Sequence, residues 1–528
     1  MIIIPEKLNR PAILAFFLGL TIRAYTALNT HLINLDGMYY INQAKNLYLG
    51  QYKEIIHTLG FLPLNSILIV PAYAIFNDWL IAARFVSLFF SIALLVPMYL
   101  TIRKFFNEEY SVAVLLVFAL IPTLVSRSPD VIKDPTSWFF LTLALYFFTC
   151  LTEEKHLKTF SFLSSISFCL AIWARNEIVL CYAITFFCIF FVVHSNRQKL
   201  ITAFVFVSPL IIVVVVEAWL QNHDIKISRL TLETILSPRP IGSTYSTIHS
   251  QLLELAGQHQ FSTIGYFFPE AANLLWLIAL GALTTTAAEA VSHLYLFLFA
   301  IGFLSMNSFS QKDKRVWYFF ALAAATTLVL YNEMLSNWIV EYRYFGVVII
   351  PAAIFAGHGI NKICTYNQTH FKTPENKTLS VIIALILIFG VTKNCQPRYL
   401  DKLVFKEIGQ TIAQKEKNTG PIHIAGASYM AIRWVSFYAN ENNPDEIIYP
   451  SQIKKLSHTQ LANCAKLAKN LSKANINYIV TEEKYLKDIK TAISADLTDF
   501  FEQQGVWHHK DTGKITLYKL KSPKIKNG

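Results

Sequence analysis

Residues 85–102 read FVSLFFSIALLVPMYLTI, a run of 18 residues without a formal charge, with Arg84 before it and Arg103 after it. The hydrocarbon core of a bilayer is crossed by a helix of about 20 mostly apolar residues, within a range of roughly 17 to 25. The run therefore predicts a membrane-spanning helix with an arginine at each end.

Similar charge-poor runs recur along the chain and bring the number of predicted spans to about eleven. The others are 11–29, 109–127, 134–153, 158–175, 178–196, 200–216, 290–311, 316–332, 344–361 and 378–392. The last is the shortest, but Lys377 and Lys393 flank it and their stems can extend to the two interfaces. The predicted fold class is an α-helical polytopic membrane protein, with 11 to 13 membrane helices depending on two further segments.

The composition agrees with a membrane protein and excludes other classes. The chain has 528 residues, of which 54% are hydrophobic and 15% charged, whereas soluble domains carry about 25% charged residues. The net charge is +12, yet no basic cluster alternates with aromatic residues, so nucleic acid is not an expected partner. The seven cysteines form no CxxC pair, so neither a disulfide framework nor a cysteine zinc site is expected. The N-terminal apolar stretch lacks a small-residue cleavage site and is interpreted as a retained first span.

Short basic segments between the spans predict the orientation, because positively charged loops stay in the cytoplasm. Six such segments are Lys7/Arg10, Arg103/Lys104, Lys155/Lys158, Arg197/Lys199, Lys312/Lys314/Arg315 and Lys362/Lys372. Neighbouring basic segments must then be joined by an even number of crossings. The apolar segments 55–77 and 271–288 are long enough to span, but they are predicted to be re-entrant or surface-lying helices at the outer face.

With this topology the acidic residues collect at the outer ends of the spans, together with the long loops 30–78, 126–134, 221–270 and 333–342. These acids are Asp36, Asp130, Asp134, Glu177, Glu217, Glu333 and Glu341. Residues 1–394 are predicted to form the membrane domain. Residues 395–528 return to a polar composition and are predicted to form a small α/β domain on the same outer side. Expected strands lie at 422–425, 447–449, 478–480 and 515–518, and an expected amphipathic helix lies at 456–474.

Two outer-face acids stand at predicted helix starts. Asp36 begins a helical stretch that Gly50 ends, and Asp134 precedes Pro135 at the start of a span. For both, an alternative to a chemical role is a helix cap, since aspartate satisfies free N–H groups there.

Two further short segments at predicted outer span ends contain an arginine close to an acidic residue. Arg175 and Glu177 are two residues apart, a spacing that does not bring side chains together on a helix, and they are compatible with interfacial charges. Glu341, Arg343 and Tyr344 are compatible with a belt of aromatic and cationic side chains.

The order of these motifs resembles that of the GT-C glycosyltransferases of the protein mannosyltransferase and aminoarabinose transferase type. The run from Asp36 through Tyr39 and Tyr40 to Ala44, Leu47 and Gly50 is similar to the first-loop pattern of that family. The further matching motifs are Leu62-Pro63-Leu64, Asp78 with Ala82-Ala83-Arg84, Asp134, Arg175-Asn176-Glu177, and Arg343-Tyr344 with Pro351. The resemblance covers roughly residues 10 to 363. The sequence departs from the pattern at Gly37, where the family usually has an acid, and at Leu62 or Leu64, where it has proline.

The resemblance implies transfer of a sugar, with inversion, from a polyprenyl phosphate to an acceptor at the outer face. Asp36 would be the base, and Asp134 would orient the acceptor or the partners of Asp36. The donor phosphate would be bound by Arg343 and Tyr344, with Arg175 and Lys133 as weaker candidates. Substrate contacts would come from Tyr39, Tyr40, Glu177 and His57, the last in place of a family His or Lys.

The expected partners are a polyprenyl-phosphate sugar donor, membrane lipids and an acceptor that is lipid A or another glycolipid, a glycan or a protein. No cofactor is required by the sequence and no metal ligand is assigned, although Asp36, Asp134 and Glu177 could converge on a divalent ion. The expected location is the inner (plasma) membrane, with the active site and C-terminal domain on the periplasmic or extracellular side. The alternative function is a transporter or flippase for a lipid-linked intermediate, for which Arg23, inside a span, is the relevant charge.

Overall fold

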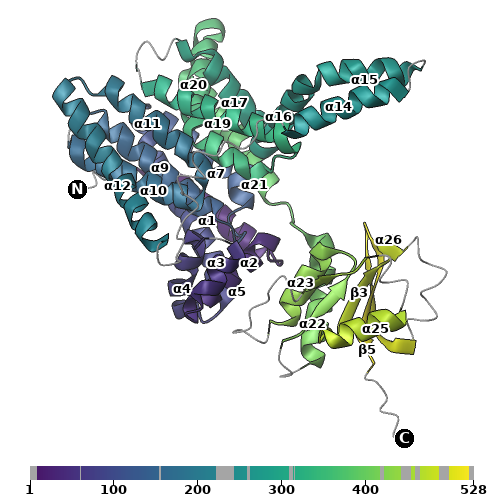
Figure 1. Ribbon diagram of the computed structural model, residues 1–528. Helices are drawn as coiled ribbons and strands as arrows, with labels where there is room; N and C mark the ends of the chain where they lie inside the picture. The colour runs from purple at the N-terminus through teal and green to yellow at the C-terminus, as the bar shows by residue number, and fades with distance from the viewer. Residues whose placement is uncertain are drawn as a thin grey trace, which may run out of the picture. The chain divides into compact units, whose positions relative to one another are not determined.

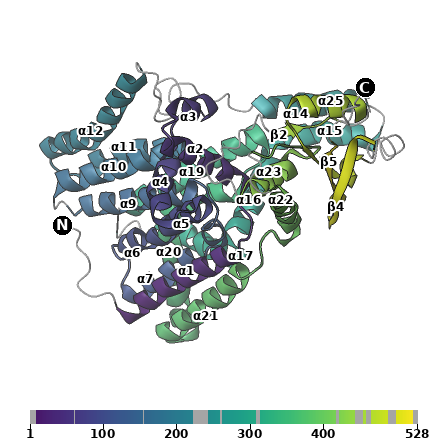
Figure 2. The ribbon, with the colours of Figure 1, turned by 90° about the horizontal axis from the view of Figure 1, so that it is seen from below.

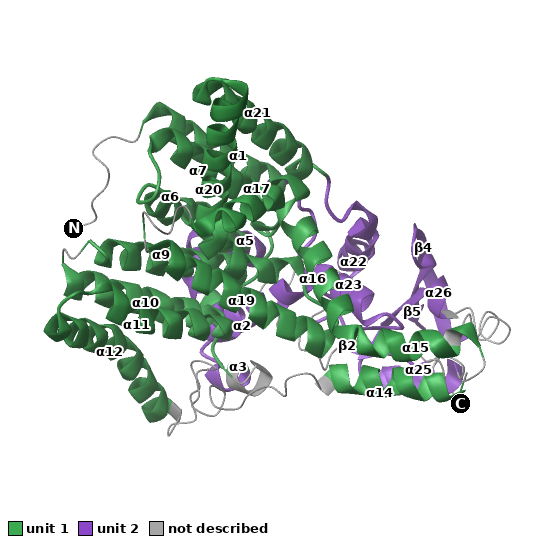
Figure 3. Cartoon of the chain, turned by 90° about the horizontal axis from the view of Figure 1, so that it is seen from above, with its two compact units in different colours: residues 1–27, 55–65, 84–396 green, residues 28–54, 66–83, 397–528 purple. Residues whose placement is uncertain are grey.

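The computed structural model in Figure 1 describes most of the chain as helices, followed by a small sheet near the C-terminus. The described residues are 9–59, 61–153, 156–221, 243–258, 262–307, 313, 315–416, 421–441, 453–457, 464–486 and 499–521. They fall into two compact units, coloured in Figure 3. Unit 1 contains residues 1–27, 55–65 and 84–396, and unit 2 contains residues 28–54, 66–83 and 397–528.

Unit 1 is built from apolar helices, as the charge-poor runs predict. Its first half contains α1 (Arg10–Leu28), most of α5 (Trp79–Ala93), α6 (Leu95–Ile102), α7 (Glu108–Leu120), α8 (Pro122–Ser126), α9 (Asp134–Leu151), α10 (Leu157–Ala174), η1 (Asn176–Ile178), α11 (Val179–Val192) and α12 (Asn196–Gln221). Its second half contains α14 (Ser243–Gln258), α15 (Thr263–Asn273), α16 (Leu275–Val291), α17 (His293–Leu304), α19 (Arg315–Asn337), η2 (Tyr342–Phe345), α20 (Gly346–Phe371) and α21 (Glu375–Asn394).

Among the described residues, seven helices are long and apolar enough to cross a membrane, or up to eight if the bent pair α15–α16 is one span. They begin at Arg10, Trp79, Leu157, Asn196, Arg315, Tyr342 and Glu375. The other expected spans also form apolar helices, but these are shorter or more deeply buried, as in α7, α9, α11 and α17. The chain is therefore a multi-pass helical membrane protein.

The core of unit 1 lies around α20, which packs against α17, α19, α7 and α9. Glycines permit the closest crossing in this core. A methyl group on Gly302 of α17 would lie 1.8 Å from the carbonyl oxygen of Phe355, and one on Gly359 would lie 2.1 Å from that of Leu298. The two backbones can therefore approach to a distance that any side chain would prevent, which is a usual form of helix packing in membranes.

Arg23 is a structural residue inside α1. It is completely buried, and its guanidinium donates to Ser91 Oγ at 3.0 Å, to Gly19 O at 3.1 Å and to Ala119 O at 2.8 Å. Figure 2 shows α1 beside α7, and α7 also packs against α21. Arg23 therefore holds α1 on the end of α7 through Nε and Nη1 of its guanidinium.

The two apolar segments that are predicted to be re-entrant or surface-lying, 55–77 and 271–288, are both interrupted. Segment 55–77 consists of α3 (Tyr52–Leu59) and α4 (Leu64–Phe76), separated by a break before Pro63. Segment 271–288 lies in α15 and α16, which meet at a 69° bend near Leu274. A bend of this size agrees with a broken span or a re-entrant loop, and placement at the outer face stays a prediction.

Unit 2 combines the first loop with the C-terminal region. The loop contributes α2 (Leu35–Tyr48) and most of α4. The C-terminal elements are η3 (Leu400–Lys402), α22 (Leu403–Lys415), β1 (Ile424–Gly426), α23 (Tyr429–Ala439), β2 (Ile453–Lys455), α25 (Cys464–Lys473), β3 (Tyr478–Glu482), α26 (Glu483–Leu486), β4 (Phe501–His509) and β5 (Gly513–Leu520). The sheet order is β2-β1-β3-β5-β4, with β1 parallel to both β2 and β3, and β5 antiparallel to β3 and β4.

The predicted α/β class of this region is confirmed, with some differences. The strands expected at 422–425, 478–480 and 515–518 overlap β1, β3 and β5, while the one expected at 447–449 lies outside the described residues. Of the helix expected at 456–474, the described residues show the part from Cys464 to Lys473, and residues 458–463 lie outside the described part. Leu456 is not helical, because it follows β2 and its N–H bonds to Gly426 O at 2.8 Å. The sequence interpretation missed β2, β4, α22 and α23.

Candidate functional site

Arg175 is the centre of a charged cluster in unit 1. It follows the last residue of α10 with extended backbone, φ −144° and ψ 112°, before η1 begins. Its side chain is only 4% exposed. A guanidinium buried to this extent needs anionic partners, because burying an unpaired charge is very unfavourable.

The first partner of Arg175 is Asp134, whose Oδ1 accepts a hydrogen bond from Nη1 of the arginine. Asp134 is the first residue of α9, is 1% exposed and is followed by Pro135 within the first turn. The alternative of a simple helix cap is wrong for Asp134, since its carboxylate is engaged by Arg175. The pair joins the beginning of α9 to the end of α10.

The second partner is Glu177, whose Oε2 lies 3.5 Å from Nε of Arg175. The expectation that these residues would not face each other is wrong, because Arg175 is extended and the helical spacing rule does not apply there. Partial burial raises the pKa of Glu177, but the charges of Arg175 and Lys133 outweigh it and lower the pKa to about 2. The side chain nevertheless stays 43% exposed, so water screens the pair.

The short helix η2, which precedes α20, completes the cluster. The ring of Tyr344 lies under the guanidinium of Arg175, at 4.7 Å from Cζ to the ring centroid, and under that of Arg343, at 5.5 Å. Arg343 in turn pairs with Glu341, with Nε 2.8 Å from Oε2. Two cations on one aromatic ring are stabilised by the ring's quadrupole and by the acids around them. Arg343 is the less buried of the two arginines.

The residues around Arg175 lie at span ends that are predicted to face outward. A separate set of contacts joins span ends that are predicted to face inward. Among the predicted outer ends, the hydroxyl of Tyr342 also donates a hydrogen bond of 2.5 Å to Glu289 at the end of α16. At the inner set, Lys104 Nζ lies 2.5 Å from Glu153 Oε1, and Lys104 O accepts a hydrogen bond from Arg315. The sorting of span ends inferred from the charges is therefore present in unit 1.

Asp36 lies in unit 2, in the first turn of α2 and partly buried. The N-cap position belongs to Asn34, so the alternative of Asp36 as the cap is wrong. The predicted end of the helix is confirmed, since α2 ends at Tyr48 and Gly50 has φ +73°, where glycine is favoured. Asp36 therefore lies in the first turn of α2, two residues after the N-cap position.

The C-terminal domain holds this helix start in place. Arg433 on α23 donates to Leu35 O at 2.5 Å, and Trp434 Nε1 donates to Ile33 O at 2.8 Å. Tyr438 Oη accepts the backbone N–H of Ile33 at 2.9 Å. The residues flanking Asp36 are therefore fixed by hydrogen bonds from α23.

Tyr39 and Tyr40, predicted to contact substrate, lie on the same helix. The Tyr39 ring lies under Arg433, 4.4 Å from Cζ, and its hydroxyl is 3.4 Å from that of Tyr429. Burial and this hydrogen bond raise the pKa of Tyr39, and Arg433 opposes the rise. Tyr40 is partly buried, and its carbonyl accepts from Ser66 Oγ at 3.0 Å.

Sequence reasoning missed Arg433, Tyr429 and Trp434. They lie almost 400 residues from the loop they contact, and no local pattern links them to it.

Of the other predicted site residues, Lys133 precedes α9 close to the cluster around Arg175 and acts electrostatically on Glu177. His57 lies in α3, and its side chain is outside the described part of the chain.

The acids suggested for a divalent ion are divided between the two units. Asp134 and Glu177 are both paired with Arg175, and Asp36 belongs to unit 2. Within the described residues, the group of His, Cys, Asp or Glu side chains close enough to hold a metal is a different one, Asp401, His509 and Asp511.

Comparison with known proteins supports the fold inferred from the motifs. Residues 63–220 match the family model of dolichyl-phosphate-mannose-protein mannosyltransferases, a range that includes Asp134 and Arg175. No curated protein matches the chain in a sequence comparison.

Three solved structures are similar over nearly the whole chain. The oligosaccharyltransferase of Archaeoglobus fulgidus, in a crystal structure with zinc and sulfate, has a TM-score of 0.56 at 15% identity and covers 96% of this chain and 72% of that one. The archaeal oligosaccharyltransferase AglB from Archaeoglobus fulgidus, with an inhibitory peptide and a dolichol-phosphate, has a TM-score of 0.51 at 14% identity, covering 98% and 75%. ArnT from Cupriavidus metallidurans in the apo state has a TM-score of 0.51 at 11% identity, covering 96% and 97%. The family match and the shared fold together confirm the resemblance carried by the motifs: the chain has the GT-C fold of the protein mannosyltransferase and aminoarabinose transferase superfamily.

Proposed function

We propose that the protein is a membrane glycosyltransferase that moves a sugar from a polyprenyl-phosphate donor to an acceptor at the outer face of the inner membrane. The observation that carries the proposal is the cluster of Asp134, Arg175, Glu177, Tyr344 and Arg343 at the predicted outer ends of the spans, with the Asp134–Arg175 pair buried at its centre. Its first three members lie within the range that matches the mannosyltransferase family. The dolichol-phosphate bound by AglB gives a precedent for a lipid-phosphate ligand on this fold.

Asp36 is the proposed general base. An acceptor hydroxyl attacks the anomeric carbon while its proton passes to the Asp36 carboxylate. The bond from that carbon to the phosphate oxygen breaks at the same time, its electron pair stays on the lipid phosphate, and attack from the opposite side inverts the anomeric centre. The hydrogen bonds from α23 to Ile33 and Leu35 support this role, because a base is effective only when it is held in position.

Arg343 is the proposed ligand of the donor phosphate. Negative charge grows on the phosphate as the bond breaks, and a guanidinium can bind two of its oxygens at once. Arg343 is paired with Glu341, whose side chain is 45% exposed, so phosphate can replace that carboxylate without the need to expose a buried acid. Lys133 adds a second cation near the same cluster, and Tyr344 supports the guanidinium from below.

Asp134 and Arg175 are proposed as positioning residues. Both are almost fully buried and bonded to each other, so their polar atoms are committed to the protein. Arg175 in turn contacts the ring of Tyr344, which also lies under Arg343. The pair would thus orient the phosphate-binding arginine through a shared aromatic ring. The proposed acceptor is lipid A or another glycolipid, a glycan or a protein.

The proposal is tested with the purified full chain in lipid nanodiscs. Polyprenyl phosphate carrying a radiolabelled sugar is supplied together with pools of glycolipid, glycan and peptide acceptors. The expected result is loss of label from the lipid, release of free polyprenyl phosphate, and label in one acceptor pool. A donor that remains chemically intact with every pool, but moves between leaflets in proteoliposomes, would contradict the proposal and favour a flippase.

A further inference from the structure

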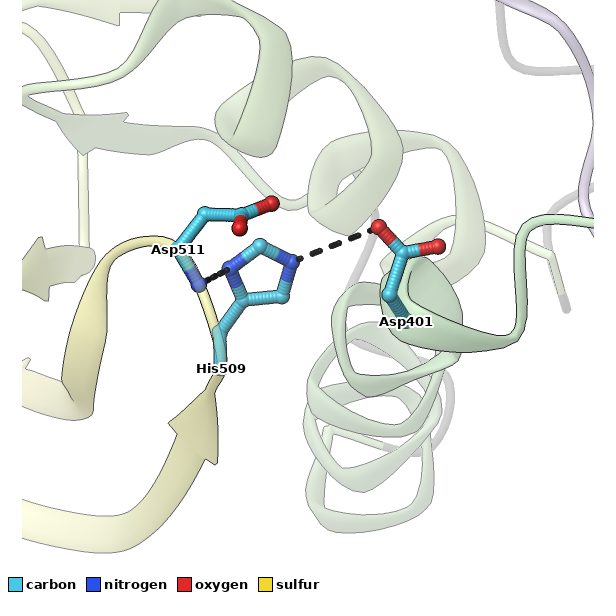
Figure 4. Close-up of side chains that lie close together, drawn as sticks. All are labelled: Asp401, His509 and Asp511. Atoms are coloured by element: carbon cyan, nitrogen blue, oxygen red, sulfur yellow. Dashed lines mark hydrogen bonds and ion pairs between the residues drawn. The ribbon is translucent and has the colours of Figure 1, made fainter.

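Three side chains with no role in the proposed transfer meet in unit 2 at the turn between β4 and β5, as Figure 4 shows. Asp401 lies in η3, His509 is the last residue of β4, and Asp511 lies in the turn that follows. One potential ligand atom from each lies within 4.8 Å of the other two. We propose that these residues bind a divalent metal ion in the C-terminal domain.

The imidazole of His509 is the main observation. The residue is 6% exposed, its Nε2 has no hydrogen-bond partner, and this nitrogen is directed at Asp401 Oδ2, 4.0 Å away. The gap is too long for a hydrogen bond, and a buried polar atom without a partner is unfavourable. Two ligands of an ion bound at about 2.0–2.2 Å are separated by roughly 3–3.5 Å. A small inward movement of Asp401 would therefore let both atoms share one ion.

The other side of the His509 ring is already held. Nδ1 lies 3.2 Å from Thr512 Oγ1 and accepts the backbone N–H of Asp511 at 3.3 Å, and the ring packs on Phe405 at 5.4 Å between centroids. A ligating imidazole keeps its proton on the nitrogen away from the metal and donates it to a neighbour. Binding through Nε2 would therefore move the ring proton to Nδ1, which would donate it to Thr512 Oγ1 and no longer accept the N–H of Asp511.

The charges of the site favour a divalent transition-metal ion. Two carboxylates face one nearby ammonium, that of Lys510 with Nζ 3.8 Å from Asp401 Oδ2. With a neutral imidazole the set remains anionic. Mixed carboxylate and imidazole ligands suit zinc or manganese, and three protein ligands leave room for water. The residues lie beside a surface hollow lined in part by Glu407, Trp507 and His508, from which an ion can enter.

The consequence of binding would be a link between distant parts of the domain. Asp401 lies in the first turn after the chain leaves α21, and the other two ligands come from a hairpin more than 100 residues later. An ion held by all three would connect the beginning of the domain to the β4–β5 edge of its sheet. Its role is therefore structural, separate from the transfer reaction.

The test uses the full chain in nanodiscs after treatment with a chelator. Zinc is added and binding is measured by calorimetry, and cobalt is added in parallel because its absorption spectrum reports nitrogen and oxygen ligands. The expected result is one ion per chain and a higher unfolding temperature with zinc than without it. H509Q, D401N and D511N should each bind at least tenfold more weakly.

Matched controls come from the same hollow. H508Q changes the exposed histidine next to His509, and E407Q changes an acid that is not a proposed ligand, so both should bind as the wild type does. Asp511 is exposed, so D511N should fold normally even if H509Q does not. Zinc affinity in D511N equal to that of the wild type, or no stoichiometric binding by the wild-type chain, would overturn the proposal.

Discussion

Arg343 and Arg175 show how burial assigns different roles to two arginines on one ring. Arg175 is enclosed with Asp134, while Arg343 pairs with a partly exposed acid. Both lie over the face of Tyr344. An arginine that can exchange its partner is suited to a transient phosphate, and one whose partner is buried is suited to fixing geometry.

The first prediction concerns R343K. Lysine keeps the charge but cannot bind two phosphate oxygens in the same plane, so one charge-assisted hydrogen bond is lost, at about 1.5–3 kcal/mol. We expect kcat/KM for the lipid donor to fall about 10- to 100-fold in a radiolabel transfer assay. R197K, at an exposed position in a predicted inner segment, should leave it unchanged. Equal activity of R343K and wild type would exclude Arg343 as the phosphate ligand.

The second prediction concerns the pH dependence of the Arg175–Glu177 pair. The pKa of Glu177 is lowered to about 2, so the stability from its ionised form is complete above the ordinary pKa of about 4.3 and is lost as the pH falls towards 2. E177Q should unfold about 1–2 °C below the wild type at pH 7 and at pH 5, because solvent screening keeps the pair weak. The difference should disappear near pH 2 in a fluorescence-monitored melt, and a constant difference over this range would contradict the assignment.

The residues of the candidate site could be predicted from the sequence, but the contacts between them could not. The outer-face acids and arginines could be selected because charges are rare and sit at span ends. The contact between Arg175 and Glu177 could not be predicted, because it depends on one residue with extended backbone between two helices. Asp401 and His509 were not recognised as a set, because their separation in the sequence has no metal-binding pattern.

Among the elements, α2 and α23 form the arrangement with the clearest consequence for function. Helix α2 carries Asp36 at its start and has no side-chain cap from Asn34. Arg433, Trp434 and Tyr438 of α23 instead bond to the backbone just before and at this start. A helix of the C-terminal domain thus fixes the backbone at Ile33 and Leu35, where the Asp36 helix begins.

The third prediction follows from this contact. R433A removes the hydrogen bond to Leu35 O and the cation over Tyr39, so the base should be held less precisely. We expect kcat to fall about tenfold while the KM for the donor changes little, and R433K should recover part of the loss. M430A, at an exposed position of the same helix, is the control. A change in KM alone would contradict a positioning role.

Element boundaries were predictable where hydrophobicity dominates and less so elsewhere. The long apolar helices follow from charge-free runs, and α2 follows from its glycine stop. By contrast, buried and exposed residues do not alternate regularly along β4. Its sequence therefore has no clear strand pattern. The bend at Leu274 follows Asn273 within the apolar segment 271–288, and one polar residue does not by itself predict a bend.

For the whole molecule, the distribution of charge connects composition with topology. The predicted outer ends of several spans meet around Arg175, and the predicted inner ends meet around Lys104. Unit 2 joins the first outer loop to the C-terminal domain, as expected if both lie on one side of the membrane. The net charge of +12 is therefore interpreted as a signal of topology, and the predicted orientation is open to a direct test.

The fourth prediction tests that orientation in intact cells. A cysteine is placed at exposed Glu502 in one variant and at exposed Arg197 in another, after exposed Cys395 is replaced by serine. A membrane-impermeant maleimide should label E502C in intact cells and R197C only after permeabilisation. The reverse pattern would place the C-terminal domain in the cytoplasm.

The most direct test of the central claim is single-turnover transfer by D36N. Asparagine has nearly the same shape but cannot accept the acceptor's proton, so the rate of the chemical step should fall about 10²- to 10⁴-fold while donor binding and folding are retained. D78N is the matched control, because Asp78 is an exposed N-cap of α5 and asparagine caps equally well. A D36N rate within twofold of the wild type, with D78N also active, would contradict Asp36 as the base.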